Sequence, residues 1–344
     1  LTSMDKYRYT QFTVLSKLEP CILYMNELTD LDTLNKVANK LLTERTSVEW
    51  SQNFDFLING AFVLSACYDG TVSAWNYEGD RLSFLKCSDY SLKALSVIPD
   101  QSSADVVKFA AGSSDQTVLI GAFHYRYNEF IISKIGVGHE ESVECVAASS
   151  DDIPLNFEND PNGRHVASGT HSSNKMTPMV TLAGHRDQVV GVCWKSPTEV
   201  ITAGWDHSIY VWNVEYLERM RTLSGDCSFT DVAYSPLNQL LLSTCTDKSV
   251  RMWDVRSSEG SMVKAFFKSH SKWASSVDWS KTNSNLFLSS DFAGLLKLWD
   301  IRNTKSPLYD MKTCAKRILS CDYSNPGYLV GGGTDGCLTM FKAM

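Results

Sequence analysis

The sequence predicts a mainly β fold, a seven-bladed β-propeller preceded by a small α+β domain. Three observations lead to this prediction. Short apolar strands alternate with turns over most of the chain, a Trp-Asp or Trp-Asn pair recurs at a nearly constant interval, and the first sixty residues instead follow a ββαβ order. A propeller blade is one four-stranded sheet, and blades of this kind repeat about every 40 to 45 residues.

The repeat is clearest in the second half of the chain. Four aromatic positions there lie 41, 46 and 42 residues apart, and an earlier Trp-Asn pair has the same form. These intervals straddle the period expected of a blade. The positions are Trp75, Trp212, Trp253, Trp299 and Phe341.

The fourth repeat has the fullest pattern, with His185 before its first strand, Asp206 at a tight turn and Trp212 in its third strand. These residues resemble the WD-repeat family, in which the histidine, the aspartate and the tryptophan are joined by hydrogen bonds. A neutral imidazole can donate to a carboxylate and accept from an indole N–H, so each buried polar group is satisfied. We expect this structural network here, with Asp247 and Trp253 as its members in the next repeat.

A search for Ser-His-Asp catalysis also selects His185 and Asp206. Histidines and turn aspartates recur with the repeats, however, and a catalytic dyad does not repeat about every forty residues. The chain also has no Gly-rich phosphate loop after a strand, no His-Glu-x-x-His and no Gly-x-Ser-x-Gly. The sequence therefore predicts a protein that is not an enzyme and has no cofactor or metal.

Several repeats depart from the pattern. The second has Gly121 where tryptophan is expected, the fifth has Asp226 where the Gly-His pair should lie, and the seventh carries Phe341 and no histidine. In the sixth, Ala293 takes the place of the turn aspartate, although Asp291 lies two residues earlier. Each loss weakens one network by about 1 to 2 kcal/mol, which packing between blades can offset. Seven repeats remain the best count.

The first sixty residues predict a separate domain. The segments 7–15, 21–25 and 54–58 have strand character, and an apolar stripe at spacings of three and four predicts a helix over 30–43. The order ββαβ fits a ubiquitin-like roll, and a cap packed on the propeller is the alternative. We therefore expect a ubiquitin-like domain at 1–60 and the propeller at 61–344.

Two places in the chain lack a strand that the pattern requires. The first repeat has no inner strand before Ala61, and the third has no room for its third strand between Ser172 and Thr177. We hypothesise that residues are missing at the junction of Gly60 with Ala61 and between 172 and 177. The ubiquitin-like domain is then incomplete, because its fourth and fifth strands should follow Gly60.

Composition excludes several classes of protein. A net charge of −7 and a pI of about 5.5 argue against autonomous nucleic-acid binding. The ten cysteines include no Cys-x-x-Cys pair, which predicts reduced, buried thiols in an intracellular protein. No apolar run approaches the roughly 18 residues needed to cross a bilayer, and we expect a soluble, non-secreted protein.

A closer resemblance rests on whole segments. FDFLING, TPMVTLAGH, AGWDHSIYVWNVE, LLKLWDIRNTKSPLYD and YLVGGGTDG resemble the WD-repeat protein twelve type of ribosome-biogenesis factor. The resemblance implies a non-catalytic assembly factor for the large ribosomal subunit, acting in pre-rRNA processing in the nucleolus and nucleoplasm. It also implies a PeBoW-type complex with a block-of-proliferation WD40 protein and pescadillo on the pre-60S particle. An acidic residue of the ubiquitin-like domain would bind the midasin AAA ATPase, but in the family's order it falls beyond Gly60 and cannot be assigned here.

Residues just before the turn aspartates point to the rim of a blade, so Tyr68 and Trp205 are candidates for partner binding. Trp273, which opens the inner strand of the sixth repeat, has a similar place. Exposed tryptophans are frequent anchors of interfaces. The alternative is that each ring packs on its neighbouring blade.

A second function competes with ribosome assembly. The segments WDVR and WDIR place Arg256 and Arg302 in a box resembling that of substrate receptors for cullin-4 ubiquitin ligases. The arginines would then face the ligase adaptor. The alternative is that each arginine only pairs with a neighbouring acidic residue at the surface.

Overall fold

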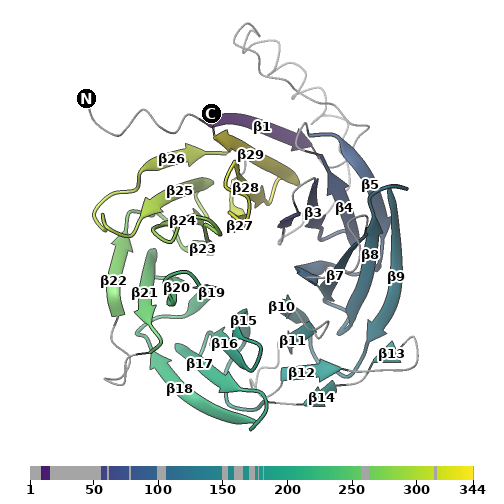
Figure 1. Cartoon of the computed structure of the whole chain (residues 1–344), viewed down its shortest axis with the longest axis horizontal. Coiled ribbons are helices and arrows are strands. Elements are labelled where there is room, and N and C mark those ends of the chain that lie inside the picture. The colour runs from purple at the N-terminus through teal and green to yellow at the C-terminus, as the bar shows by residue number, and fades with distance from the viewer. Residues whose placement is uncertain are drawn as a thin grey trace, which may run out of the picture.

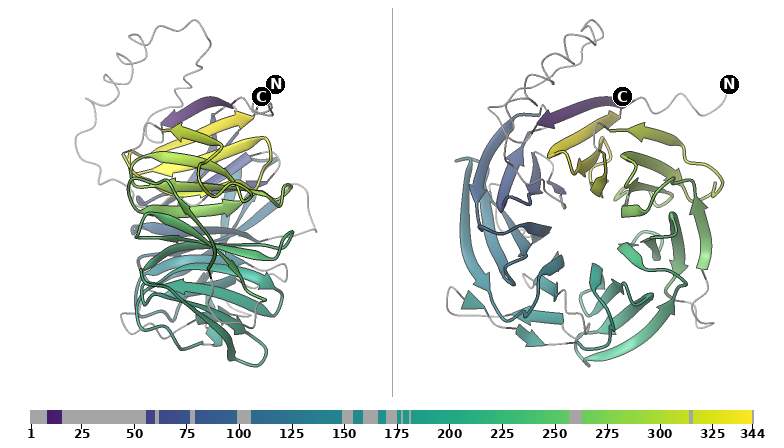
Figure 2. Two further views of the ribbon diagram at one scale, coloured as in Figure 1. Left: turned by 90° about the vertical axis from the view of Figure 1, so that its left-hand side faces the viewer. Right: turned by 180° about the vertical axis from the view of Figure 1, so that it is seen from behind.

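The strands form a ring of sheets. The computed structural model describes residues 9–15, 56–59, 62–76, 79–98, 106–148, 154–158, 166–169, 175–176, 178–180, 182–256, 263–313 and 316–343. Over these residues there are seven sheets, each mainly antiparallel, arranged around a central axis (Figure 1). Figure 2 shows the same ring from its edge and from behind. The predicted seven-bladed propeller is therefore confirmed.

Blades are numbered here in chain order, and each is given from its inner to its outer strand. Blade 1 is β2 (Phe56–Asn59), β3 (Phe62–Ala66), β4 (Thr71–Trp75) and β5 (Arg81–Lys86). Blade 2 is β6 (Leu92–Ile98), β7 (Val106–Ser113), β8 (Val118–His124) and β9 (Glu129–Gly136), with β13 (Lys175–Met176) added at its edge. Blade 3 is β10 (Val143–Ala148), β11 (Pro154–Glu158), β12 (Val166–Gly169) and β14 (Pro178–Val180).

The other four blades follow the same order. Blade 4 is β15 (Val189–Ser196), β16 (Glu199–Gly204), β17 (Ser208–Asn213) and β18 (Glu218–Ser224). Blade 5 is β19 (Phe229–Ser235), β20 (Leu240–Cys245), β21 (Ser249–Asp254) and β22 (Val263–Lys268). Blade 6 is β23 (Ala274–Trp279), β24 (Leu286–Asp291), β25 (Leu295–Asp300) and β26 (Tyr309–Lys312). Blade 7 is β27 (Ile318–Asp322), β28 (Tyr328–Gly333), β29 (Cys337–Ala343) and β1 (Tyr9–Leu15).

The N-terminal strand β1 is the outer strand of the last blade. It runs antiparallel to β29 over its whole length, from Tyr9 opposite Ala343 to Leu15 opposite Cys337, and Figure 1 shows the two strands side by side. The expectation that 1–60 form a separate domain is wrong for this strand. Pairing with β29 covers a sheet edge that would otherwise be open.

The strand β2 also belongs to the ring. It pairs with β3, with Asn59 opposite Phe62, and so supplies the inner strand that blade 1 was expected to lack. A domain boundary between residues 60 and 61 is therefore incorrect, because it would cut this sheet. The predicted helix over 30–43, the strand over 21–25 and the junction of Gly60 with Ala61 lie outside the described residues.

Blade 3 reaches four strands without additional residues. Its second strand, β11, pairs with β10 and with β12, so β12 is the third strand that the sequence was predicted to lack. The outer strand β14 pairs with β12, and the short β13 pairs in parallel with β9 of blade 2. The proposed loss of a strand between 172 and 177 is thus not required by the sheet.

Large aromatic side chains fill the space between blades. Trp299 stacks on Phe287 with ring centroids 6.0 Å apart, and Phe267 meets Trp299 edge-on at 5.4 Å. In blade 2 the missing tryptophan is replaced from the neighbouring strand, because Phe109 lies opposite Gly121 and is fully buried. A Cβ atom at Gly121 would lie 2.6 Å from the Phe109 ring.

Hydrogen bonds also connect the inner strands of successive blades. Asp231 of blade 5 accepts hydrogen bonds from the Ser276 hydroxyl at 2.8 Å and the Val277 N–H at 3.0 Å, both in blade 6. Asp278 of blade 6 in turn accepts from the Tyr323 N–H beside blade 7 at 2.9 Å. These bonds hold neighbouring blades in register around the axis.

Candidate functional site

The hydrogen-bond network of blade 4 has four members rather than three. The Nδ1 atom of His185 lies 3.1 Å from both carboxylate oxygens of Asp206, and its Nε2 atom lies 2.7 Å from the Thr202 hydroxyl. The Trp212 indole donates to Thr202 at 2.9 Å. The predicted bond from this indole to the histidine is therefore wrong. Because the Thr202 oxygen accepts from the indole, its own proton is free to go to Nε2, and Nδ1–H then donates to Asp206.

Blade 6 repeats this arrangement. His270 lies 2.9 Å from Asp291 and 2.8 Å from the Ser289 hydroxyl, which accepts from the Trp299 indole at 2.9 Å. The aspartate that takes part is Asp291, so the alanine at 293 does not remove the network. Both histidine rings are buried and both of their nitrogen atoms have partners. A structural role follows, since no nitrogen is left to act as a base on a substrate.

The bridging hydroxyl was missed by sequence reasoning, although a signal for it exists. In four blades a serine or threonine lies ten residues before the tryptophan and accepts from its indole N–H. This spacing places the two side chains on neighbouring strands of one hairpin, close enough to meet. The hydroxyl residues are Ser65, Thr202, Ser243 and Ser289.

Hydrogen bonds at these turns favour the ionised form of each aspartate. Burial works against ionisation of Asp206, but hydrogen bonds from His185 and from two backbone N–H groups outweigh it and lower the pKa of the carboxyl. The pKa of Asp291 is lowered in the same way, by His270 and the backbone, against the effect of burial. Each carboxylate is a stable acceptor at neutral pH.

Blade 5 uses an arginine where other blades use histidine. The Arg251 side chain is 4% exposed, and its Nη2 atom donates to Asp247 at 2.7 Å and also to Asp226 and the sulfur of Cys227. The Trp253 indole donates separately to Ser243 at 2.8 Å. Asp226 therefore fills the place of the missing Gly-His pair, with Arg251 completing the link to the turn aspartate.

One end of the ring carries a cluster of exposed aromatic rings. Trp205 is 43% exposed and Trp273 is 47% exposed. The same backbone hydrogen bond recurs at one end of blades 4 and 6, where the Trp205 N–H donates to Gln188 and the Phe292 N–H donates to Trp273. Trp205 is therefore equivalent to Phe292, and Trp273 lies opposite that position on the neighbouring strand. Both tryptophans therefore lie at the same face of the ring.

Phe292 and Arg317 extend this cluster. The Trp273 and Phe292 rings lie 6.1 Å apart, and the Arg317 guanidinium lies 5.7 Å from the Phe292 ring centre. We call Trp205, Trp273, Phe292 and Arg317 the mouth surface. Its four residues line one end of a cavity of about 800 Å³ along the axis of the ring.

Tyr68 does not join the mouth surface. It is half-buried at the turn between β3 and β4 of blade 1 and is not among the residues that line the axial cavity. Of the predicted rim residues, the structure brings Trp205 and Trp273 to one cavity and leaves Tyr68 apart.

The two arginines of the Trp-Asp-x-Arg boxes lie on their own aspartates. Arg256 donates through Nε and Nη2 to Asp254 at 2.9 and 2.8 Å, and Arg302 makes the same fork with Asp300. The Arg256 guanidinium holds the pKa of Asp254 at about 2. Their side chains remain 54% and 73% exposed, so each arginine is paired but still open to solvent.

Comparison with known proteins places the chain in a family. A family model described as WD domain, G-beta repeat, matches residues 176–213, 217–254 and 261–300. The chain is 31% identical to a ribosome biogenesis protein WDR12 homolog of Culex quinquefasciatus over 300 residues, which are 82% of this chain and 70% of that protein. The chain belongs to the WDR12 family.

Other WDR12 homologs agree with this placement. The homolog of Anopheles gambiae is 33% identical over 299 residues, covering 82% of this chain and 69% of its own. The homolog of Drosophila erecta is 32% identical over 298 residues, covering 83% and 70%. Among the described residues, no helix is long and apolar enough to span a membrane.

Proposed function

We propose that this chain is a non-catalytic assembly factor in the biogenesis of the large ribosomal subunit, acting in pre-rRNA processing. The observation that carries the proposal is a closed ring with a mouth surface of exposed aromatic residues, in a chain of the WDR12 family. The names of its relatives support a role in ribosome biogenesis, and the resemblance of its blades supports a scaffolding role within a PeBoW-type complex.

The geometry of the ring suits a scaffold. Successive blades are joined by hydrogen bonds such as those from Asp231 and Asp278, so the surface is ordered before a partner arrives. A preordered surface loses little conformational entropy on binding. Trp205 and Trp273 offer the large, half-exposed indoles that commonly anchor protein interfaces.

We assign the mouth surface to the propeller of a block-of-proliferation WD40 protein, which would hold pescadillo in turn. The complex would act on the pre-60S particle in the nucleolus and nucleoplasm. A net charge of −7 supports protein partners over direct binding to RNA. A link to the midasin AAA ATPase would use the N-terminal region, and the resemblance alone supports it.

A recovery experiment from nuclear extract tests the scaffold proposal. The full chain with Trp205→Ala and Trp273→Ala should recover about tenfold less block-of-proliferation protein and pescadillo than the unchanged chain. Tyr216→Ala is the matched control, because Tyr216 is 71% exposed in the β17–β18 connection, at the opposite end of blade 4 from Trp205. Equal recovery by all three proteins would remove the mouth surface from the proposal.

The same experiment separates the competing function. A substrate receptor of a cullin-4 ligase would recover cullin-4 and its adaptor, and Arg256→Ala with Arg302→Ala would abolish that recovery. The forks on Asp254 and Asp300 argue against it, since each guanidinium must leave a charged partner before it can bind an adaptor. If Arg256→Ala reduced the recovery of pescadillo, the assignment of the scaffold contact to the mouth surface would be contradicted.

A further inference from the structure

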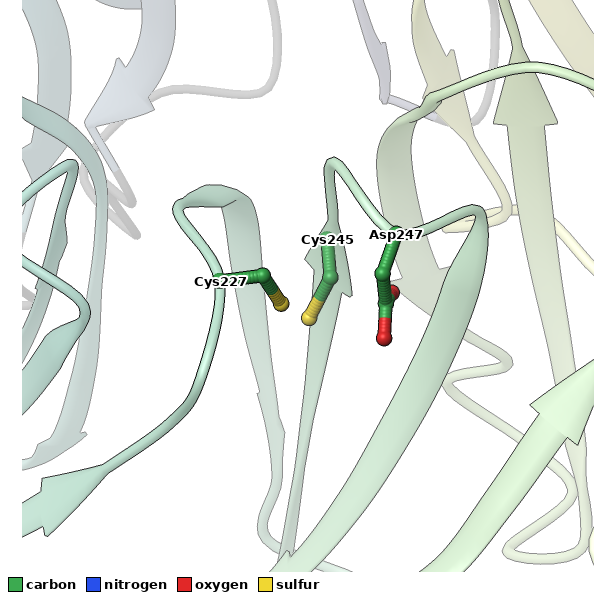
Figure 3. Close-up of side chains that lie close together, drawn as sticks. All are labelled: Cys227, Cys245 and Asp247. Atoms are coloured by element: carbon green, nitrogen blue, oxygen red, sulfur yellow. The ribbon is translucent and has the colours of Figure 1, made fainter.

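Two cysteines of blade 5 meet beside the arginine network. Cys245 ends β20 and is fully buried, while Cys227 lies half-buried in the connection between β18 and β19. Their sulfur atoms and a carboxylate oxygen of Asp247 all lie within 4.8 Å of one another. Figure 3 shows the two thiol groups turned toward each other. The two sulfurs are thus already neighbours in the folded chain.

The two thiols differ in their electrostatic surroundings. The Cys245 thiol hydrogen-bonds to the Cys227 sulfur, and this bond, together with the Arg251 guanidinium 3.0 Å away, lowers the pKa of Cys227 against burial and the charge of Asp247. The same hydrogen bond and burial raise the pKa of Cys245 far above its usual range. The Cys227 thiol therefore ionises more readily than an ordinary cysteine, and the Cys245 thiol keeps its proton.

Cys227 is also within reach of solvent. Its side chain is only partly buried, whereas that of Cys245 is fully buried. Other cysteines are shifted the opposite way, since burial raises the pKa of Cys87 to about 11 and that of Cys193 to about 12. Thiolate character and access together decide which cysteine reacts with oxidants. Both favour Cys227.

A metal ion is the other ligand that this cluster could attract, because two thiolates and a carboxylate are ligands that zinc uses. The guanidinium of Arg251 already donates to Cys227, Asp226 and Asp247. A fixed positive charge thus already contacts two of the three candidate ligands, Cys227 and Asp247. A second cation at this place would be repelled, so the geometry favours oxidation over metal binding.

We propose that Cys227 and Cys245 form a site of reversible oxidation by peroxides, which closes a disulfide between them. The Cys227 thiolate attacks one peroxide oxygen, the O–O bond breaks, and hydroxide leaves as water with one proton, giving a sulfenic acid. The Cys245 sulfur then attacks Cys227, the S–O bond breaks, and a second water leaves with the Cys245 proton. The two thiols lose two electrons and the peroxide gains them. A dithiol reductant reverses the reaction.

Formation of the disulfide requires only a small movement of the two sulfur atoms. A disulfide requires the sulfurs to come within about 2.05 Å of each other, from a starting distance inside 4.8 Å. Cys245 is held in β20, whereas Cys227 lies in a connection outside the strands, two residues before Phe229, which is the residue opposite Cys245. Cys227 is therefore the residue that moves.

Mass spectrometry of the full chain tests the proposal. Trypsin cleaves after Arg221 and Lys248, so both cysteines fall in one peptide that contains no other cysteine. After treatment with hydrogen peroxide and blocking of free thiols, this peptide should lose the mass of two hydrogens and take up no blocking reagent. Dithiothreitol should restore both thiols. Oxidation should be about tenfold faster at this peptide than at Cys193.

Three variants separate the steps. Cys245→Ser should stop at the sulfenic acid, which dimedone traps on Cys227, and Cys227→Ser should leave Cys245 reduced. Arg251→Lys, which keeps the charge but not the three donated bonds, should slow the reaction several-fold. Near-ultraviolet circular dichroism confirms that each variant is folded. If Cys245→Ser does not fold, the result with Cys227→Ser decides.

Two outcomes would overturn the proposal. One is a folded chain in which peroxide leaves both thiols of this peptide free while other cysteines react. The second is zinc that stays bound through gel filtration and protects both thiols from peroxide, which would make the cluster a metal site instead.

Discussion

His270 and Asp291 lie 2.9 Å apart and 21 positions apart in the chain, the same separation as His185 and Asp206. In blade 6 the aspartate comes two residues after the bridging Ser289, whereas in blade 4 it comes four residues after Thr202. The separation from the histidine is kept although the separation from the hydroxyl is not. The network thus tolerates a change in the turn as long as a carboxylate reaches Nδ1.

The bridging hydroxyl of blade 4 should be worth more than one hydrogen bond. In Thr202→Val, the shape of the side chain is kept, but the Trp212 indole and the Nε2 atom of His185 both lose their partner. We expect the free energy of unfolding in urea to fall by about 2 to 4 kcal/mol. Thr222→Val on the exposed edge of β18 is the control and should change it by less than about 0.5 kcal/mol. Equal losses in both variants would contradict this account.

Filling the empty position of blade 2 should destabilise the protein. A Cβ atom at Gly121 would lie 2.6 Å from the Phe109 ring and 2.9 Å from the Ile131 carbonyl oxygen, which is backbone and cannot turn away. Gly121→Ala should therefore lower the free energy of unfolding by about 1 to 3 kcal/mol, although alanine suits a strand better than glycine. Gly327→Ala, where the nearest atom lies at 3.4 Å, should be close to neutral. Thermal unfolding of the two variants checks the difference.

The stability of the fold should depend on pH through Asp322, which lines the axial cavity. Burial and the charge of Asp278 raise the pKa of Asp322 to about 7, well above its value of about 3.9 in the unfolded chain. The folded state then binds more protons than the unfolded state between these two values. The contribution of Asp322 to the free energy of unfolding is therefore fully present below about pH 4. It is lost as the pH rises through 7, which lowers the stability by roughly 2 to 4 kcal/mol.

The variant Asp322→Asn tests this dependence. Asparagine keeps the oxygen that accepts from the Ser324 N–H and hydroxyl, at 3.0 and 2.7 Å, but carries no charge. We expect the variant to be more stable than the unchanged chain at pH 8 and to show a flatter profile between pH 5 and 8. Parallel profiles in urea unfolding would mean that Asp322 does not titrate in this range.

The two acidic partners of Arg251 should differ in importance. Arg251→Met leaves the part-buried Asp247 without its cation and should lower the free energy of unfolding by about 2 kcal/mol. Asp226→Asn should have little effect, because the Asp226 side chain is 84% exposed and water replaces its contact. Chemical unfolding of the two variants side by side measures the contrast. A larger loss in Asp226→Asn would mean that the exposed pair holds blade 5 together.

The repeat was visible in the sequence because each blade is local. A tryptophan and the residues that meet it, such as Trp212 and Thr202, lie ten positions apart in one hairpin, so periodicity alone places the strands. The pairing of β1 with β29 could not be found in this way, because its two partners lie at opposite ends of the chain. Local pattern gave β1 its strand character but not its neighbour.

The candidate site was predictable only in part. Trp205 and Trp273 were selected from their places before a turn and a strand, and both are about half exposed. Tyr68 had the same local place, yet its blade does not bring it to the cavity. The environment of Cys227 could not be foreseen either, since Arg251 joins two groups of the β18–β19 connection to Asp247 in the β20–β21 turn. Contacts between residues of different turns depend on tertiary packing, which local sequence patterns do not reveal.

The junction of β1 with β29 sets an order of events during synthesis. Blades 1 to 6 are built from strands that lie close together in the chain and can form as they leave the ribosome, but β1 has no partner until β29, Cys337–Ala343, has emerged. Until then the nascent chain is an open arc with a sheet edge at which another strand can pair. Ring closure is therefore the last and most non-local step of folding. Substitutions in either strand should reduce the yield of folded protein in the cell more than the stability of the finished ring.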